Sequence, residues 1–363
     1  MFDVEKLAVL ATDYCVPISE DKKIGIMSNT VAEPLIQQLY KQVILKGGHP
    51  VVHLQVDGMF ELLFTYGNKK QLTHVSPFTK FFFEHIDGII QVYAETNLKK
   101  LSNVPASRIR ERQASQRELA EIHTNRFLRP GGWTLIPYPT LAFAQEAEMS
   151  LFEYEDFITK ACFLDKTNPS QEWRKLSRRQ EAIRQKLDRA KEMRFVGEDT
   201  DLKMRVEGRK WENCDGHLNM PDGEIFTGPI ENSAEGKIRF TYPGIYLGRE
   251  VEDITLTFKG GKVVRAEAGK GDELLQQILK TDEGASRIGE IAIGTNTGIT
   301  RFTKNMLFDE KMGHCIHLAL GLGIPDTGSL NKSSIHWDIL KDMRKGEIYV
   351  DKQLIYQNGK IIT

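Results

Sequence analysis

The 363 residues of this chain are enough for more than one ordinary domain, and 40% hydrophobic with 27% charged residues is typical of folded protein. The 49 lysines and arginines nearly balance the 50 aspartates and glutamates, so the net charge of −1 gives no electrostatic reason to expect a nucleic acid as the main partner. The four cysteines form no CxxC pair, the start of the chain does not resemble a signal peptide, and no apolar run approaches membrane-spanning length. We therefore expect a soluble cytoplasmic protein that binds neither nucleic acid nor membrane.

The first half of the chain alternates strand-like apolar segments with amphipathic helical segments. We expect helices at residues 2–12 and 32–46 and strands at 24–27, from 49, at 88–93 and at 133–136. This β-α-β order predicts a parallel sheet covered by helices. The chain contains neither a GxGxxG motif nor a P-loop, which argues against a nucleotide site in this half.

A long helical tract is predicted from Ile158 to Gly197. Its apolar stripe consists of Trp173, Leu176, Ile183, Leu187 and Met193. Most other positions carry charges of alternating sign, which indicates a solvated helix face rather than a basic surface for an acidic partner. We expect this helix to bridge two domains.

From Val196 onward, apolar and polar residues alternate as they do in half-buried antiparallel strands. Gly260 and Gly261 lie between two such runs and predict a hairpin turn. The predicted architecture is an α/β domain with a mostly parallel sheet at residues 1–194, which ends in the long helix. An α+β domain with a largely antiparallel sheet follows at residues 195–363, and it contains the candidate site.

In the second domain, acidic residues occur within apolar segments that also contain glycines. Glu290 lies in IGEIAIG, where an ionised carboxylate is costly to bury alone, so a cation partner is favoured. Glu224 follows a Pro-Asp-Gly turn at which strand pairing is expected to begin. Carboxylates and neutral imidazoles are the ligands that divalent cations take in proteins.

Two further motifs contribute Glu310, His317, His336 and Asp338. In FDEKMGHCIHLALG, His317 is favoured over His314 because it begins a small-residue stretch in which backbone can pack closely around a metal. In IHWD, residues two apart point to the same side of a strand, and the KDMRK segment that follows is predicted to be helical.

Three glutamates, one aspartate and two histidines are too many for one tetrahedral zinc. Two ions that share a bridging carboxylate use all six, and such a pair activates water near neutral pH for amide or ester hydrolysis. The predicted ligands are Glu224, Glu290, Glu310, His317, His336 and Asp338.

The motifs NMPDGEIFTGP, RIGEIAIGTN, LFDEKMGHCIHLALG and KSSIHWD closely resemble the aminopeptidase T family of dinuclear metalloaminopeptidases. WTLIPYPTLAFAQEAEMS and GRKWENCDGHLNMP extend the resemblance over nearly the whole chain. It implies a cytoplasmic, two-domain, homodimeric enzyme that releases N-terminal residues from peptides with a free N-terminus. It also implies that the six residues hold two divalent ions (cobalt, zinc, magnesium or manganese), with Glu290 as the bridge. We expect Glu290 or Glu310 to move the proton.

One position departs from the family pattern. Family members usually have a tyrosine seven residues after the first metal histidine, and this chain has Ile324 there. A tyrosine hydroxyl can hydrogen-bond an oxyanion, and isoleucine cannot; loss of one such donor costs on the order of a hundred-fold in turnover.

Two alternatives remain open. The first is a mononuclear iron dioxygenase that cleaves hydroxylated pyridine rings, with His317, His336 and Asp338 as a triad of two histidines and one carboxylate. Retention of all three glutamates argues against it. The second is a metal-binding protein that has lost peptidase activity, with Ile324 as the mark of that loss.

Overall fold

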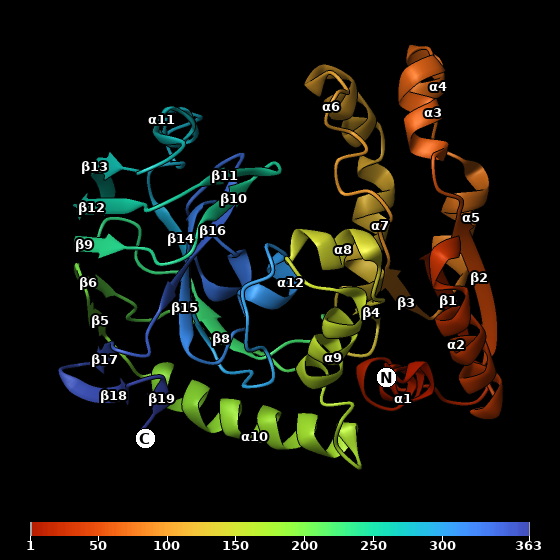
Figure 1. Cartoon of the computed structure of the whole chain (residues 1–363), viewed down its shortest axis with the longest axis horizontal. Helices are drawn as coiled ribbons and strands as arrows, with labels where there is room; N and C mark the ends of the chain where they lie inside the picture. The colour runs from red at the N-terminus through yellow and green to blue at the C-terminus, as the bar shows by residue number, and fades with distance from the viewer. Residues whose placement is uncertain (1, 363) are drawn as a thin grey trace. The chain divides into compact units, whose positions relative to one another are not determined.

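The computed structural model describes residues 2–362, which separate into two compact units. The first unit runs to Glu172 and includes Gly216–Pro221; the second comprises Trp173–Asp215 and the residues from Asp222 onward. Figure 1 colours the first mostly red to yellow and the second mostly green to blue. No helix among residues 2–362 combines the length and apolar character needed to cross a bilayer.

The first unit contains a four-stranded parallel sheet in the order β2-β1-β3-β4. Each predicted strand of this half is present, and so are the two predicted helices, the first of which continues as one π-helical turn. The elements are α1 (Val4–Leu10), η1 (Ala11–Cys15), β1 (Lys23–Asn29), η2 (Thr30–Ala32), α2 (Glu33–Leu45), β2 (His49–Gln55), α3 (Met59–Tyr66), α4 (Lys69–Leu72), α5 (Pro77–His85), β3 (Gly88–Tyr93), α6 (Ala106–Ser115), α7 (Arg117–Phe127), β4 (Trp133–Pro137), α8 (Leu141–Glu146) and α9 (Leu151–Ala161).

The predicted continuous helix from Ile158 to Gly197 is wrong in its extent. The structure has α9, then α10 (Pro169–Leu187), then strand β5 (Glu192–Gly197). Pro169 starts a new helix because its ring disfavours helical backbone at the residue before it, and the Asn168 side chain accepts a hydrogen bond from Gln171 N at 3.0 Å. Met193 belongs to β5, where it pairs with two neighbouring strands.

The second unit holds two antiparallel sheets and a two-stranded ribbon, β10-β11. One sheet has eight strands in the order β13-β12-β9-β6-β5-β17-β18-β19, and the other has five in the order β16-β15-β14-β8-β7. The remaining bounds are β6 (Thr200–Arg205), β7 (Glu212–Cys214), β8 (Glu224–Thr227), β9 (Glu235–Arg239), β10 (Gly244–Tyr246), β11 (Arg249–Val251), β12 (Thr255–Lys259), β13 (Lys262–Glu267), α11 (Asp272–Leu279), β14 (Ile288–Gly294), α12 (Met306–Asp309), β15 (Cys315–Gly321), η3 (Pro325–Thr327), β16 (His336–Asp342), β17 (Glu347–Val350), β18 (Gln353–Gln357) and β19 (Lys360–Ile361).

The hairpin predicted at Gly260 and Gly261 joins β12 to β13, as expected. The helix predicted for KDMRK is wrong, because Lys341 and Asp342 continue β16 and pair with β15. One apolar core lies against strands of both large sheets of this unit, which fixes the five-stranded sheet that carries the candidate ligands. The predicted fold class, a parallel α/β half followed by a largely antiparallel α+β half, is confirmed.

Candidate metal centre

Strand register places four of the predicted ligands on one face of the five-stranded sheet. Glu290 on β14 pairs with Ala319 on β15, which pairs with Asp338 on β16. His317 is two residues from Ala319, and His336 is two residues from Asp338. Because side chains two apart along a strand share a face, both histidines lie on the face of Glu290 and Asp338.

The other two predicted ligands come from β8 and from the end of α12. Glu224 is the first residue of β8 and pairs with Gly294, an even number of residues along β14 from Glu290, so it shares that face. Glu310 caps the carboxyl end of α12. The opposite face of β14 and β15 contributes the buried core residues Ile291, Ile293, Ile316 and Leu318.

The six side chains converge on one small volume. His317 Nε2 lies 3.0 Å from Glu290 Oε1 and 3.7 Å from Asp338 Oδ1, while its Nδ1 lies 3.7 Å from Glu224 Oε2. His336 Nε2 lies 3.5 Å from Asp338 Oδ1 and 3.7 Å from Glu290 Oε2. Three overlapping groups drawn from these six residues have ligand atoms mutually within 4.8 Å: Glu224, Glu290 and His317; Glu290, His336 and Asp338; Glu310, His317 and Asp338. A fourth group joins Glu224 to Cys214 and Asp222.

Backbone carbonyls fix the orientation of both imidazoles. His317 Nδ1 lies 3.2 Å from the carbonyl of Glu310, and His336 Nδ1 lies 2.8 Å from the carbonyl of Leu322. A carbonyl can only accept, so each Nδ1 carries the hydrogen and each neutral ring turns an Nε2 lone pair toward the carboxylates. His317 Nε2 and Glu290 Oε1 are then both acceptors, although they lie only 3.0 Å apart. Such a contact requires a proton or a metal ion between the two atoms.

Two carboxylate oxygens in the cluster have no hydrogen-bond partner although they are buried: Glu224 Oε2 and Asp338 Oδ1. Buried anionic oxygens without partners are costly, and a cation removes that cost. The donor set of carboxylate oxygens and imidazole nitrogens suits a divalent ion. On these observations the residues fit the predicted metal ions.

The electrostatics of the cluster favour positive charge. Burial opposes the charge on His317, but the hydrogen bond to Glu290 and the nearby carboxylates raise its pKa to about 10. Burial likewise opposes the charge on His336, and Asp338 is the main group that raises its pKa to about 9. Burial raises the pKa of Glu224 to about 8, against the influence of Lys311. A bound divalent cation acts in the opposite direction on each of these groups, because it favours the deprotonated form of a ligand.

Sequence reasoning missed Lys311, which lies inside the acidic cluster. Its Nζ lies 2.5 Å from Glu224 Oε1, 2.5 Å from Glu310 Oε1 and 3.8 Å from Asp222 Oδ1, and its side chain is 2% exposed. Burial disfavours its charge, but the carboxylates outweigh burial and hold the pKa of the ammonium well above its ordinary value. A lysine beside an acidic residue in sequence normally indicates a solvated surface, so only its burial in the fold distinguishes it.

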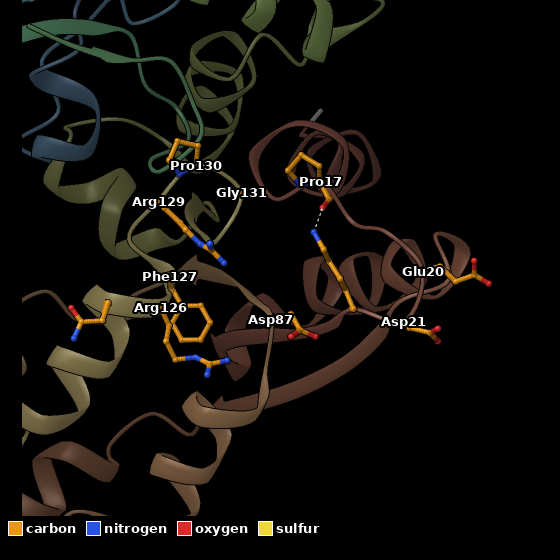
Figure 2. A pocket seen from close by; sticks show the side chains of 11 residues that line it. Pro17, Glu20, Asp21, Asp87, Arg126, Phe127, Arg129, Pro130 and Gly131 are labelled. Carbon is orange, nitrogen blue, oxygen red and sulfur yellow. Dashed lines mark hydrogen bonds between the residues drawn. The ribbon is translucent and has the colours of Figure 1, made fainter.

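Two other features lie outside this cluster. His314, the histidine not favoured from the sequence, is half-buried beside Gly359 and belongs to none of the candidate ligand groups of residues 2–362. A cavity of about 900 Å³ in the first unit is lined by side chains of both charge signs, among them Asp87, Arg126 and Arg129 (Figure 2). It contains no group of convergent metal-ligating residues, so the cluster on β14, β15 and β16 is the candidate site.

Comparison with known proteins identifies the family of this chain. The family model described as thermophilic metalloprotease (M29) matches residues 2–361. The chain belongs to this family. Aminopeptidase 2 of Geobacillus stearothermophilus is 31% identical over 243 residues, which are 57% of this chain and 58% of that relative. The match therefore spans less than two thirds of the relative's length.

Solved structures place the M29 chain among known folds. The structure of wild-type AmpT from Thermus thermophilus matches with a TM-score of 0.85 at 21% identity, over 99% of both chains. The structure of 2,5-dihydroxypyridine dioxygenase from Pseudomonas putida KT2440 matches with a TM-score of 0.61 at 14% identity, over 99% of this chain and 96% of the other. The resemblance to the aminopeptidase T family is confirmed by the family match and by the shared fold.

Proposed function

We propose that this M29 protein is a metal-dependent aminopeptidase that releases N-terminal residues from peptides with a free N-terminus. The observation that carries the proposal is the convergence of four carboxylates and two imidazoles around unpartnered buried oxygens. Its family membership and the aminopeptidase relative support the same reaction.

We assign the ligand roles from the contacts. Glu290 lies between the two histidines, with Oε1 toward His317 and Oε2 toward His336, so it would be the carboxylate shared by the two ions. Glu224 with His317 would complete one metal position, and His336 with Asp338 would complete the other. Glu310 adds its oxygen on the side of His317 and Asp338.

The charge of the cluster supports two ions. The four carboxylates of the cluster and the neighbouring Asp222 carry five negative charges when all are ionised, and the ammonium of Lys311 offsets one of them. The four remaining negative charges balance the four positive charges of two divalent cations. The candidates are cobalt, zinc, magnesium and manganese, and measured metal content of the purified protein decides both number and identity.

We propose that either Glu290 or Glu310 is the carboxylate that moves the proton. Its side chain is 18% exposed, whereas those of Glu224 and Glu290 are 5% and 8% exposed. A carboxylate that meets solvent can take a proton from the attacking water and pass it to the leaving amine, which favours Glu310. Both candidates are held by neighbours, Glu290 by the two histidines and Glu310 Oε1 by Lys311, so comparison of Glu290→Gln with Glu310→Gln decides between them. When bound, the ions supply a water of lowered pKa and polarise the scissile carbonyl.

The test is aminopeptidase turnover on a panel of amino-acid anilides after loading with each candidate metal. The Glu290→Gln variant removes the bridging charge, and turnover is expected to fall by more than about a hundred-fold, since loss of an outer-shell partner alone costs up to about that much. Glu283→Gln is the matched control, because Glu283 is 85% exposed and lies 3.6 Å from Lys262, outside the cluster. Turnover in Glu290→Gln equal to that of the control would contradict the proposal.

The activity of the native chain depends on whether the missing hydrogen-bond donor at Ile324 is needed. It lies directly before η3, where family members usually have tyrosine, and it cannot donate a hydrogen bond to an oxyanion. If this is the missing donor, Ile324→Tyr raises turnover by on the order of a hundred-fold. A chain that binds metal and cleaves no anilide, with or without the tyrosine, would instead be a metal-binding protein without peptidase activity.

The dioxygenase reading is not favoured. His317, His336 and Asp338 do lie together, as an iron triad requires, but Glu224 and Glu290 share their ligand groups. An iron triad needs neither glutamate. Uptake of oxygen that depends on ferrous iron and a hydroxylated pyridine would reverse this assignment.

The remaining expectations are proposals about the whole protein. We propose that it has two domains, that it works as a homodimer and that it resides in the cytoplasm. The boundary expected between residues 194 and 195 falls inside β5, an inner strand of the eight-stranded sheet, so the two compact units that divide at Glu172 are the better assignment of the domains. Its four cysteines form no disulfide within residues 2–362, which is compatible with a reducing compartment. Light scattering after size exclusion tests the dimer, cell fractionation tests the compartment, and limited proteolysis between α9 and α10 tests the boundary.

A further inference from the structure

Lys311 is a buried cation within the candidate metal centre, and the proposed reaction gives it no role. Its ammonium contacts Glu224 Oε1 and Glu310 Oε1, each at 2.5 Å, and lies 3.8 Å from Asp222 Oδ1. The side chain is 2% exposed, so it is enclosed by protein along its length. A buried ammonium is retained only where its partners compensate for lost hydration, which makes a fortuitous position costly.

The contacts distinguish two possible roles for this lysine. Its ammonium could occupy a metal position and so compete with an ion. Alternatively, it could orient Glu224 and Glu310 by binding the carboxylate oxygens that the metal does not use. Lys311 takes one oxygen of Glu224 and leaves the other, Oε2, buried and without a hydrogen-bond partner. That second oxygen lies 3.7 Å from His317 Nδ1, and Glu224 belongs with Glu290 and His317 in one ligand group.

Glu310 likewise combines a contact to Lys311 with membership of a ligand group. Oε1 is the oxygen bound to Lys311, and Glu310 is also grouped with His317 and Asp338 as a metal ligand. Ion binding therefore does not require the lysine to leave. Metal ligands are commonly held by outer partners that fix their orientation, and a cation between two glutamates does this for both.

We propose that Lys311 is a positioning residue that fixes Glu224 and Glu310 as one-oxygen ligands and stays in place when the metal ions bind. This inference rests on the proposed metal-dependent function and adds to it a permanent protein cation inside the centre. It predicts that removing the ammonium weakens metal binding, whereas a competing lysine predicts tighter binding.

The experiment compares metal binding by the native chain, Lys311→Met and Lys341→Met. Lys341 is the matched control, because it is also a buried lysine of the second unit, but its Nζ donates to the backbone carbonyls of Arg239 and Glu198 at 2.9 and 3.1 Å. Zn²⁺ affinity is measured by competition with a chelating dye, and Co²⁺ absorption spectra report the coordination. Neither readout depends on activity.

Lys311→Met is expected to bind Zn²⁺ about 10- to 100-fold more weakly and to change the Co²⁺ spectrum, as loss of an outer partner of metal ligands does. Lys341→Met is expected to leave both readouts unchanged. Equal or tighter Zn²⁺ binding by Lys311→Met overturns the inference. If the native chain itself binds no divalent ion, the proposed function fails instead.

A second measurement keeps the inference testable if Lys311→Met does not fold. In a crystal structure of the native chain loaded with Zn²⁺, Lys311 Nζ should remain within about 3 Å of both Glu224 and Glu310. A lysine that has turned away from either glutamate, with an ion in its place, identifies a competitor and overturns the inference.

Discussion

Gln180 offers a direct test of how α10 supports the candidate centre. Its side chain is fully buried, and its Nε2 donates to Asn213 Oδ1 at 2.6 Å, to the Cys214 carbonyl at 2.9 Å and to the Glu224 carbonyl at 3.1 Å. Its Oε1 accepts from Thr295 Oγ1 at 2.5 Å. One side-chain amide therefore joins α10 to β8, the strand whose first residue is Glu224.

Gln180→Met keeps the volume and removes every one of these hydrogen bonds. Thr295 Oγ1 and Asn213 Oδ1 lose a buried partner, and each group left unsatisfied costs about 1–3 kcal/mol. The expected loss in the free energy of unfolding is about 2–6 kcal/mol. Because the backbone at Glu224 is also released, we expect metal affinity to fall as well.

The assay is urea unfolding followed by far-UV circular dichroism, with the shift in midpoint converted to free energy. Gln185→Met is the matched control, because Gln185 lies on the same helix but is exposed, and its side chain donates to Glu181 Oε1 at 2.9 Å, also on the helix surface. It should change stability by less than about 0.5 kcal/mol. The reasoning is refuted if the two variants are equally stable.

Three further predictions concern the second unit. Hydrogen bonds, the largest from Ser334 N, lower the pKa of Asp282 from 3.8 to about 2. The stability that Asp282 contributes is present above its unfolded pKa and is lost as pH falls toward 2. Asp282→Asn should therefore be less stable than the native chain at pH 7 and equal to it near pH 2 in denaturation curves; a constant difference would contradict this. Gly261→Ala should destabilise more than Gly260→Ala in the same assay. Both have positive φ, but a Cβ on Gly261 would lie 1.9 Å from Glu231 O, whereas one on Gly260 meets nothing within 4 Å; equal losses would exclude the overlap. Removing divalent ions with a chelator should lower the thermal midpoint, since ions at a hundred times their dissociation constant add about 2.7 kcal/mol, and an unchanged midpoint would argue against a folded-state metal site.

Local sequence was sufficient for much of the fold because the patterns involved are local. The strands and helices of the first unit follow from apolar periodicity and glycine stops, and β3 (Gly88–Tyr93) has the predicted bounds. The helix expected at KDMRK was wrong because Lys341 and Asp342 pair with β15, and such pairing overrides local helical propensity. The long helix was wrong in extent because its apolar stripe did not reveal the start at Pro169 or the pairing of Met193.

The sequence by itself predicted the chemistry of the candidate centre, because a carboxylate or imidazole within an apolar strand has few stable environments other than beside a cation. Only the tertiary structure decided which additional groups enter it. Lys311 and Gln180 lie in segments whose charge is typical of solvated surface, and their roles depend on contacts with Glu224, which is 87 and 44 residues away. Periodicity specifies which face of an element a side chain occupies, whereas the residue opposite it is fixed by the packing of distant strands and helices.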